Sequence, residues 1–446
     1  ALGLWAVLLV SLLGFGAYVL VRGDVVGLAG LAVRPGVLQA LRAAAAVVGL
    51  GWLALLLHAA YIAGFHRWEP VQRLVAGALT LALAVVGLTP VGAAARYAGI
   101  QRDLISDVFV DRADSHTITA KRNRERPNGR VNLLLLGGDG GKNRVGVRTD
   151  SMLVASVDKR TGKAVLISLP RSLQEAPFPP ESPLAERFPN GFDAKDGLLS
   201  SVYVFGAQHR ELFPHARDPG AEAIMQVAGE ITGLPIDRYA LVNLRGFQRL
   251  VQAMGGVDIL VQERVPIGGR MGPGGVVIEE PDGWIEPGYK HLDGYEALWY
   301  ARGRFGSNDY SRMRRQRCVM NAILGQAKPW KVIRNYQEIA ASAKALVSTN
   351  VPQRQLPELV DIALDTRKHR IVNVTFTRDV IDTVDPDFDR MRRIVRRAID
   401  KSLAGGDRPG AGGTGAAKPK RAKPAGTATA KPRDITDDLE RTCGSR

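Results

Sequence analysis

The sequence predicts an α/β domain, built on a mixed central β-sheet flanked by helices, that follows an N-terminal transmembrane helical region. Long apolar runs fill most of residues 1–95. From residue 131 to 402, short β-like runs alternate with helical ones, which is typical of an α/β domain. We expect a polar connector at 96–130. The basic tail at 403–446 is rich in Gly, Pro, Ala and Lys and has almost nothing to bury, so it should be disordered.

The membrane prediction rests on three apolar runs, Leu2–Val21, Ala43–Ala63 and Leu74–Val91. Each has close to the ~20 residues that a helix needs to cross a bilayer, and none contains a formal charge. The alternatives are a buried helix of a soluble core or, for the first run, a signal peptide. Because the runs follow one another closely, we expect about three crossings of the cell membrane. The arginines near the loops do not fix the orientation.

The folded domain is expected to begin with a strand at 131–136, which is apolar except for Asn132 and therefore buried on both faces. Two further runs, 151–157 and 163–169, flank a turn at 158–162 and predict a β-hairpin.

The middle of the domain continues the alternation. A helix is expected at 221–232, where Gly233 supplies a natural C-cap. A strand at 239–244, a helix at 246–254 and a strand at 255–260 follow.

Three elements complete the domain. A long helix at 308–326 is capped by Asn308 or Asp309, and a strand follows at 371–377. A basic helix that Asp385 caps is expected to run to Lys401.

An arginine cluster at 300–317 gives the strongest sign of function, because it contains a single acidic residue, Asp309. Guanidinium groups this close repel one another unless an anion lies between them, and their planar donors match phosphate oxygens. The cluster therefore predicts a pyrophosphate site.

Two carboxylates upstream, Asp139 and Asp150, suit a divalent metal beside that site. Mg²⁺ prefers oxygen ligands and takes the rest of its shell from water and substrate phosphates. Together with the arginines, these residues suggest phosphoryl transfer, in which Asp139, Asp150, Arg302 and Arg304 would be catalytic. The alternative is that Asp139 caps a turn while Asp150 only pairs with Arg148.

The spacing of the arginines suggests which of them act together. Arg312 and Gln316 are four residues apart, so on a helix they share a face near its anion-binding N-terminus. Arg302 and Arg304 would point the same way if their segment is extended. Two other arginines should point elsewhere and be solvated, or meet an outer polyanion: Arg314 and Arg317.

The two cysteines, Cys318 and Cys443, leave two readings open. Each can be a buried free thiol, or they can form a disulfide outside the cytosol. A lipid carrier would also need an apolar groove, for which 198–205 and 223–231 are candidates, although such stripes also occur in ordinary cores.

A series of motifs resembles the LytR-CpsA-Psr family of cell-wall glycopolymer transferases. They run in order over residues 131–325: Leu134-Leu-Leu-Gly-Gly-Asp139, Arg148-Thr-Asp150, Ser168-Leu-Pro-Arg171, Gly233-Leu-Pro-Ile-Asp-Arg-Tyr239, Gly255-Gly-Val257, Leu292-Asp-Gly-Tyr-Glu-Ala-Leu298, Tyr300-Ala-Arg-Gly-Arg304 and Asp309-Tyr-Ser-Arg-Met-Arg-Arg-Gln316. Two positions depart from the family pattern, Gly141 and Ser172, and both bear on the loops near the site.

The resemblance implies an extracytoplasmic catalytic domain, anchored in membrane lipid, that moves a glycopolymer from a polyprenyl-pyrophosphate carrier onto peptidoglycan with the help of Mg²⁺. By likeness, Asp139 and Asp150 would hold the metal. The residues that would grip the pyrophosphate are Arg148, Arg171, Arg302, Arg304, Arg312 and Gln316. No general base is assigned.

Two rival functions remain at this point. A pyrophosphatase would use the same site with water as the acceptor. The net charge of +16 and the basic tail also raise a membrane-tethered nucleic-acid-binding regulator. Because no helix-turn-helix or zinc-finger pattern is present in the sequence, we expect no nucleic-acid partner.

Overall fold

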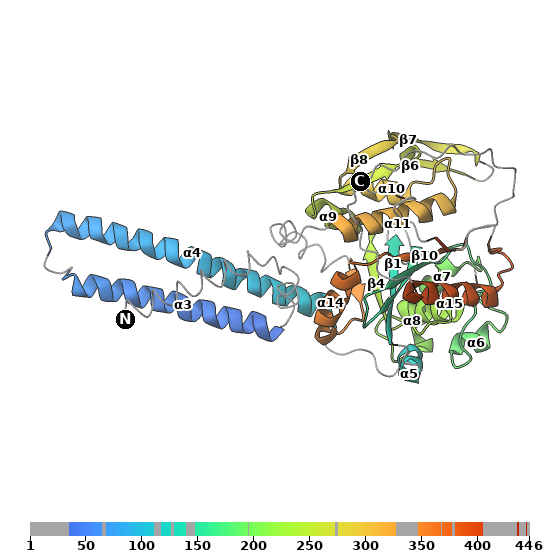
Figure 1. Ribbon diagram of the computed structural model, residues 1–446, viewed down its shortest axis with the longest axis horizontal. Helices are drawn as coiled ribbons and strands as arrows, with labels where there is room; N and C mark the ends of the chain where they lie inside the picture. The colour runs from blue at the N-terminus through green and yellow to red at the C-terminus, as the bar shows by residue number, and fades with distance from the viewer. Residues whose placement is uncertain are drawn as a thin grey trace. The chain divides into compact units, whose positions relative to one another are not determined.

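The structure is a computed structural model, and its chain divides into two compact units, Ala1–Asp111 with Pro352–Asp361, and Arg112–Val351 with Ile362–Arg446 (Figure 1). It describes residues 35–64, 68–110, 117–125, 129–139, 148–194, 196–272, 275–326, 347–366, 368–376, 380–404 and 435–436, together with Cys443. The first apolar run, 2–21, lies outside the described residues, so the expected third crossing remains a prediction.

The first unit is built on two long helices, α3 (Pro35–Ile62) and α4 (Pro70–Val108). Both are long and apolar enough to cross a membrane. The pair packs closely, since the Trp52 indole N–H donates to the Leu83 carbonyl (3.1 Å) and any side chain at Gly87 would collide with Trp52.

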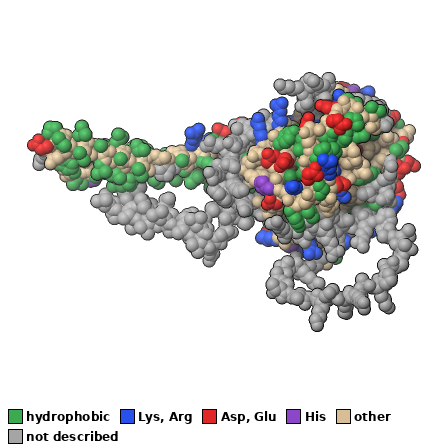
Figure 2. Space-filling model, turned by 90° about the horizontal axis from the view of Figure 1, so that it is seen from above, with side chains coloured by type: hydrophobic (Ala, Val, Ile, Leu, Met, Phe, Trp, Pro, Cys, Tyr) green, Lys and Arg blue, Asp and Glu red, His purple; other side chains and the backbone are tan. Residues whose placement is uncertain are grey.

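The outward surface of this helix pair is apolar, which a soluble protein would avoid. Leu57, Tyr61, Leu74 and Val86 are all exposed, and Figure 2 shows apolar side chains along the outside of the pair. The two units also correct one predicted boundary. The expected connector at 96–130 is not one segment, because α4 continues through its first part, while α5 (Ile118–Glu125) belongs to the second unit.

The second unit contains a seven-stranded sheet in the order β11-β10-β3-β2-β1-β4-β9. The β1–β4 and β3–β10 pairs are parallel and the others antiparallel, so the sheet is mixed, as predicted. Its strands are β1 (Arg130–Asp139), β2 (Arg148–Asp158), β3 (Ala164–Ser168), β4 (Arg238–Asn243), β9 (Val347–Thr349), β10 (Val372–Thr375) and β11 (Ile435–Thr436). The predicted hairpin is β2–β3.

One face of the sheet carries the main core. Alternate side chains of the strands, such as Leu134 and Val154, are fully buried there against helices. These helices are α7 (Leu199–Gln208), α8 (Pro219–Thr232) and α15 (Phe388–Ala404), with the short α6 (Pro183–Arg187) nearby. The C-cap of α8 is Gly233 at φ 70°, as the sequence predicts.

The opposite face of the sheet meets a second set of elements (Figure 1). They are α9 (Leu244–Ala253), α10 (Gly294–Arg302) and α11 (Asp309–Gln326). A smaller apolar cluster joins these helices to four strands that form two ribbons: β5 (Val257–Val261) with β8 (Gly288–Leu292), and β6 (Val265–Met271) with β7 (Val277–Ile285). The helix α14 (Leu356–Thr366) follows β9.

The C-terminal part of the chain differs from expectation in two places. The cap of α15 is Asp387, whose carboxylate accepts a hydrogen bond from the Arg390 N–H (2.7 Å), and not Asp385. The tail is not wholly without structure, because β11 adds an edge strand to β10 and Cys443 forms a disulfide with Cys318. The rest of 405–446 lies outside the described residues.

Candidate active site

A cavity of about 270 Å³ lies between the second face of the sheet and the helices α9, α10 and α11. Its lining has two kinds of residue. The polar lining residues include Asp150, Ser151, Arg302, Arg304, Arg312 and Gln316. The apolar ones include Leu135, Leu153, Val242, Phe247, Leu250, Val319, Met320 and Ile323. The cavity can therefore hold a molecule with an anionic part and an apolar part.

The helix α11 explains why the two kinds of lining separate. Arg312, Gln316, Val319, Met320 and Ile323 follow one another at spacings of four, three, one and three residues, so they lie along one face. From first to last, this face covers about 16 Å at the 1.5 Å rise of a helix. It is cationic and polar in its first half and apolar in its second.

Two carboxylates lie among three guanidinium groups at the polar part of the cavity. Asp150 pairs with Arg171 (2.5 Å) and with Arg304 (3.2 Å). Asp309 pairs with Arg171 (3.2 Å) and with Arg312 (3.3 Å). The partners of Asp150 among the described side chains come from the loop after β3 and from the turn after α10. The Arg148 side chain lies outside the described residues, so the alternative of an Asp150–Arg148 pair is not tested.

Burial and the surrounding guanidinium groups shift the pKa of Asp150 in opposite directions. Burial alone would raise the pKa of its carboxyl group, but Arg171, Arg304 and Arg312 outweigh burial and lower the pKa below the ordinary value. Asp150 is therefore ionised at neutral pH.

Arg312 is the most confined cation of the site, with only 2% of its side chain exposed. Burial, and then the neighbouring Arg304, lowers its pKa to about 10, so it remains charged at neutral pH. Within the described part of the chain, its Nε and Nη1 have no hydrogen-bond partner, although Nη1 lies 3.3 Å from Asp309. Buried donors of this kind are costly unless a ligand accepts from them.

The expectation of an extended 302–304 segment is wrong. Arg302 is the last residue of α10, Gly303 is its C-cap, and Arg304 lies in the following turn. The Arg302 guanidinium sits 4.9 Å from the Trp299 ring centre. Both arginines still line the same cavity, because the chain turns where α10 ends.

Gln316 also reaches the site, as predicted. Its side-chain oxygen accepts a hydrogen bond from the Ser151 hydroxyl (3.0 Å), and its amide nitrogen donates to the Ala301 carbonyl (3.3 Å). Gln316 thus links the sheet to the end of α10 at the polar part of the cavity.

Arg315 is a residue whose role the sequence does not reveal. Its side chain is 3% exposed and donates to the Tyr300 carbonyl (2.8 Å), to the Gly303 carbonyl and to the Ser307 hydroxyl (3.5 Å). Arg315 therefore holds in place the turn that carries Arg304. In the sequence it is one arginine among several, and no spacing rule separates it from the others.

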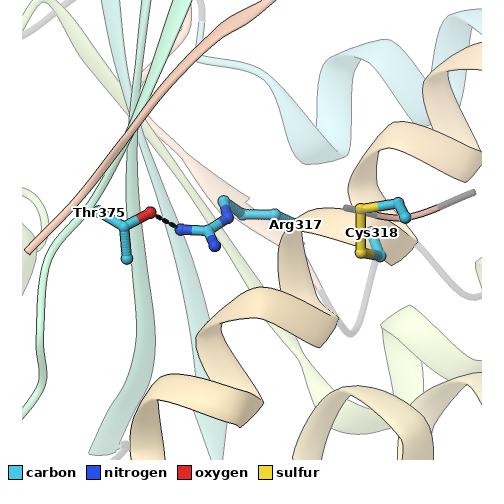
Figure 3. The surroundings of a disulfide bond; sticks show 4 residues. Arg317, Cys318 and Thr375 are labelled. Atoms are coloured by element: carbon cyan, nitrogen blue, oxygen red, sulfur yellow. Dashed lines mark hydrogen bonds between the residues drawn. A yellow bond between two sulfur atoms is a disulfide. The ribbon is translucent and has the colours of Figure 1, made fainter. Parts of the chain in front are cut away.

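The expectation that Arg317 is solvated is also wrong. Arg317 is buried and donates to the Thr375 hydroxyl on β10. The side chain of its neighbour Cys318 points to the other side of α11 and forms the disulfide with Cys443 (Figure 3). Burial lowers the pKa of Arg317 to about 10. A helix enclosed by protein on several sides has no wholly solvated face, and this is why the simple two-face argument fails. Arg314 keeps partial exposure and pairs with Glu263 (2.6 Å).

The other two predicted site residues are placed only by their backbone. Asp139 is the last residue of β1 and Arg148 the first residue of β2, and the two are partners in the register of these strands. Their side chains lie outside the described residues. Among the residues that the structure does describe, no group of three or more His, Cys, Asp or Glu side chains could hold a metal ion by itself.

The apolar segments proposed as a lipid groove are misplaced. Residues of 198–205 and 223–231 belong to the main core on the first face of the sheet. The apolar lining of the cavity comes instead from β1, β2, β4, α9 and α11. In the sequence, this lining is indicated by one face of α11, which changes from polar at Arg312 to apolar at Ile323.

An α/β domain whose cavity joins arginines, one of them buried, to an apolar lining is suited to an amphipathic anion. The chain belongs to the LytR_cpsA_psr family, whose family model matches residues 105–393. The resemblance described above is thereby confirmed.

Three relatives are between 26% and 28% identical to this chain over the residues that align. It is 26% identical over 227 residues to Biofilm regulatory protein A of Streptococcus mutans, covering 49% of each chain. It is 28% identical over 241 residues to the polyisoprenyl-teichoic acid–peptidoglycan teichoic acid transferase TagU of Enterococcus faecalis, covering 53% of this chain and 65% of the relative. The cell wall biosynthesis protein LcpA of Corynebacterium glutamicum is 26% identical over 254 residues, which is 55% of this chain and 46% of LcpA.

The chain thus spans between about half and two thirds of the length of these relatives. Among solved structures, TagT bound to LIIa-WTA aligns with a TM-score of 0.42 and 16% identity, covering 66% of this chain and all of TagT. A Streptococcus agalactiae protein aligns with a TM-score of 0.45 and 21% identity, covering 63% of this chain and 90% of that protein.

Proposed function

We propose that this protein is a transferase that attaches a glycopolymer, delivered on a polyprenyl-pyrophosphate carrier, to peptidoglycan. Family membership and the names of the relatives support the class of reaction. The observation that carries the proposal is Arg312, a buried cation with unmatched donors in a cavity whose other lining is apolar. A pyrophosphate with a polyprenyl chain matches both parts of that cavity.

In this proposal the pyrophosphate accepts hydrogen bonds from Arg171, Arg302, Arg304 and Arg312, with Gln316 beside them, and the polyprenyl chain occupies the apolar part. A hydroxyl group of the peptidoglycan acceptor attacks the phosphorus nearer the donor glycan. A new oxygen–phosphorus bond forms, the bond to the bridging oxygen breaks, the hydroxyl proton passes to solvent, and polyprenyl phosphate leaves. Positioning and neutralisation of the phosphate charge supply most of the rate in such transfers, and guanidinium groups suit both tasks.

We also propose Mg²⁺ as the cofactor, held by Asp139 and Asp150. The donor chemistry fits, because Mg²⁺ commonly takes one or two protein carboxylates and completes its shell with phosphate oxygens and water. Asp150 is ionised and lines the cavity, as a ligand must. When bound, the ion would withdraw charge from the phosphoryl oxygens. A pyrophosphate that took the hydrogen bonds of Arg171 and Arg304 would leave the Asp150 oxygens open to the metal.

The location that we propose is a multi-pass membrane protein with an extracytoplasmic catalytic domain. Two helices suited to crossing a membrane support the anchoring. The Cys318–Cys443 disulfide supports an oxidising compartment for the domain, because disulfides are rare in the cytosol.

Product analysis tests the proposal. The full chain in detergent is given a polyprenyl-pyrophosphate-linked glycopolymer, Mg²⁺ and soluble peptidoglycan strands, and the products are identified by mass spectrometry. We expect a phosphodiester between glycopolymer and peptidoglycan, together with polyprenyl phosphate. Release of free glycopolymer phosphate at the same rate with and without peptidoglycan would instead establish the rival pyrophosphatase.

A further inference from the structure

The ribbon β6–β7 exposes apolar side chains that the cavity does not use. Outside α3 and α4, the exposed large apolar residues in the described chain are Met271, Val276, Val277, Ile278, Tyr289, Tyr295, Val384 and Leu403. The first four lie together at one end of this ribbon, and we call them the hairpin tip. Single exposed apolar residues are ordinary, but a contiguous group usually marks a binding surface.

The hairpin tip is held by its own hydrogen bonds. Met271 pairs with Val277 in the β6–β7 register, and the Gly272 N–H donates to the Val276 carbonyl (2.7 Å). A side chain at Gly272 would meet Ile278 at 3.0 Å, so a glycine there lets Ile278 lie across the turn. The aliphatic side chains therefore lie at the end of a hydrogen-bonded ribbon whose register shifts between Arg270 and Met271.

The hairpin tip is attached to the polar part of the cavity through the turn after α10. The Gly306 N–H donates to the Met271 sulfur (3.3 Å), and Phe305 packs against Gly269 and, edge to face, against Trp284 (6.2 Å). The same turn carries Arg304, which lines the cavity. Cavity and hairpin tip thus share one short segment of chain.

The charges around the hairpin tip favour a partner that is apolar and not a polyanion. No charged residue lies between Arg270 and Glu279 in the sequence. The flanking strands carry a net negative charge, because Arg270 lies 3.9 Å from Glu279 and Arg264 pairs with Glu286 (3.0 Å), while Glu280 and Asp282 add two further carboxylates. Charge attraction therefore contributes little here, and burial of aliphatic surface would provide the binding energy.

We propose that the hairpin tip inserts into the surface of a phospholipid bilayer and so places the polar part of the cavity against the membrane. A bilayer is the partner that the chain itself supplies, since α3 and α4 are suited to crossing one. The carrier lipid then passes from bilayer to cavity beside Arg304, and this last step rests on the proposed function.

A photo-crosslinking experiment tests insertion without any need for activity. Benzoylphenylalanine replaces Val277 in the full chain, which is reconstituted into phosphatidylcholine vesicles and irradiated. We expect a covalent adduct with phosphatidylcholine at residue 277. The matched control places the same amino acid at Val384, which is comparably exposed, and it should give no lipid adduct. Protein dimers in place of lipid adducts at 277, or equal lipid adducts at both positions, would overturn the proposal.

A kinetic experiment tests delivery of the carrier. Val277→Asp with Ile278→Asp should raise KM for a long-chain carrier in vesicles about tenfold, because a charged tip no longer partitions into lipid. Turnover of a water-soluble short-chain analogue should be unchanged, and Val384→Asp should alter neither. An equal loss with both substrates would refute the delivery role. If the wild-type chain turned over neither substrate while the lipid adduct at 277 persisted, the proposed function would fail and insertion would stand.

Discussion

At the scale of single residues, the site holds three arginines but only two carboxylates, so its positive charge is not fully matched. Arg312 has donors without acceptors, while Asp150 and Asp309 are shared among three arginines. An arrangement of this kind is costly in the free protein and is compensated only when an anion binds. The binding of substrate is therefore expected to stabilise the domain as well as to prepare the reaction.

Arg312→Lys should lower kcat/KM about a hundredfold or more, because an ammonium group cannot make the parallel hydrogen bonds that a guanidinium makes to phosphate. Arg314→Lys is the matched control. Arg314 lies on the same helix, is partly exposed and pairs with Glu263, so its substitution should change the rate less than threefold, by our rough estimate for a surface pair. Steady-state kinetics of both variants decide the matter. Similar losses in the two would mean that the arginines act only as diffuse charge.

Asp158→Asn should lower stability in a pH-dependent way. The Asp158 carboxylate accepts hydrogen bonds from the Thr161 hydroxyl and N–H (2.8 Å each) in the β2–β3 turn. Burial alone would raise its pKa, but these bonds and Arg130 bring the pKa below the ordinary 3.8. The folded state thus releases this proton more readily than the unfolded state does. Its contribution is complete above the ordinary pKa and is lost as the pH falls through the folded pKa.

Denaturation of both proteins at pH 7, 5 and 3 measures this effect. The variant should be less stable by about 1 kcal/mol at pH 7 and pH 5, and the gap should shrink by pH 3. A gap that stays constant across this range would show that the carboxylate charge does not matter to the turn.

At the scale of elements, the sequence predicted β1 to β5, β10 and the helices α8, α9, α11 and α15. It did not predict α7, α10 or the ribbon β6–β7, nor how the helices surround the cavity. The strand β1, the β2–β3 hairpin and the Gly233 cap of α8 follow from local rules, and the structure confirms them. The cavity lining could not be separated from core by pattern. An apolar stripe on α7 or α8 has the same spacing whether it meets a core or a ligand. Only the packing of α9 and α11 against the sheet decides which stripe remains accessible.

The turn between α10 and α11 is the element most sensitive to a distant side chain. Arg315→Lys should lower kcat about tenfold, since one ammonium group cannot serve the Tyr300, Gly303 and Ser307 oxygens together. Arg315 is a positioning residue. Hydrogen exchange should therefore become faster at 303–307 in this variant and stay unchanged in Arg312→Lys. A rate loss without faster exchange would contradict the positioning role.

At the scale of the whole molecule, the C-terminal segment of the chain is attached to the folded domain. Two contacts in the described chain fix it there: β11 on the edge of β10, and Cys443 on α11. The sequence left the disulfide as one of two readings and did not predict β11, because two distant cysteines and a two-residue strand carry no periodic signal. The composition of the tail suggests disorder, but composition does not predict which single residues of the tail contact the folded domain.

Truncation after Ala404 should therefore lower the free energy of unfolding, although the tail's composition alone would make it dispensable. Cys443→Ser should cost on the order of 2–5 kcal/mol, as expected for a disulfide that closes a long loop. The truncation should cost more, because it also removes β11. Thermal unfolding in detergent compares the two with the wild type. Wild-type stability in the truncated chain would show that neither contact contributes.

The disulfide also determines how the domain responds to mechanical tension. Tension applied to the chain after Cys443 is transmitted through the disulfide to Cys318 on α11. The segment between the two cysteines, with a sequence separation of 125, does not bear this tension. When the disulfide is reduced, the segment between the two cysteines can extend. The fully stretched chain then becomes longer by about 430 Å at ~3.4 Å per residue. Because Cys318 lies only two residues after Gln316, a load on the tail would be delivered to the helix that lines the cavity.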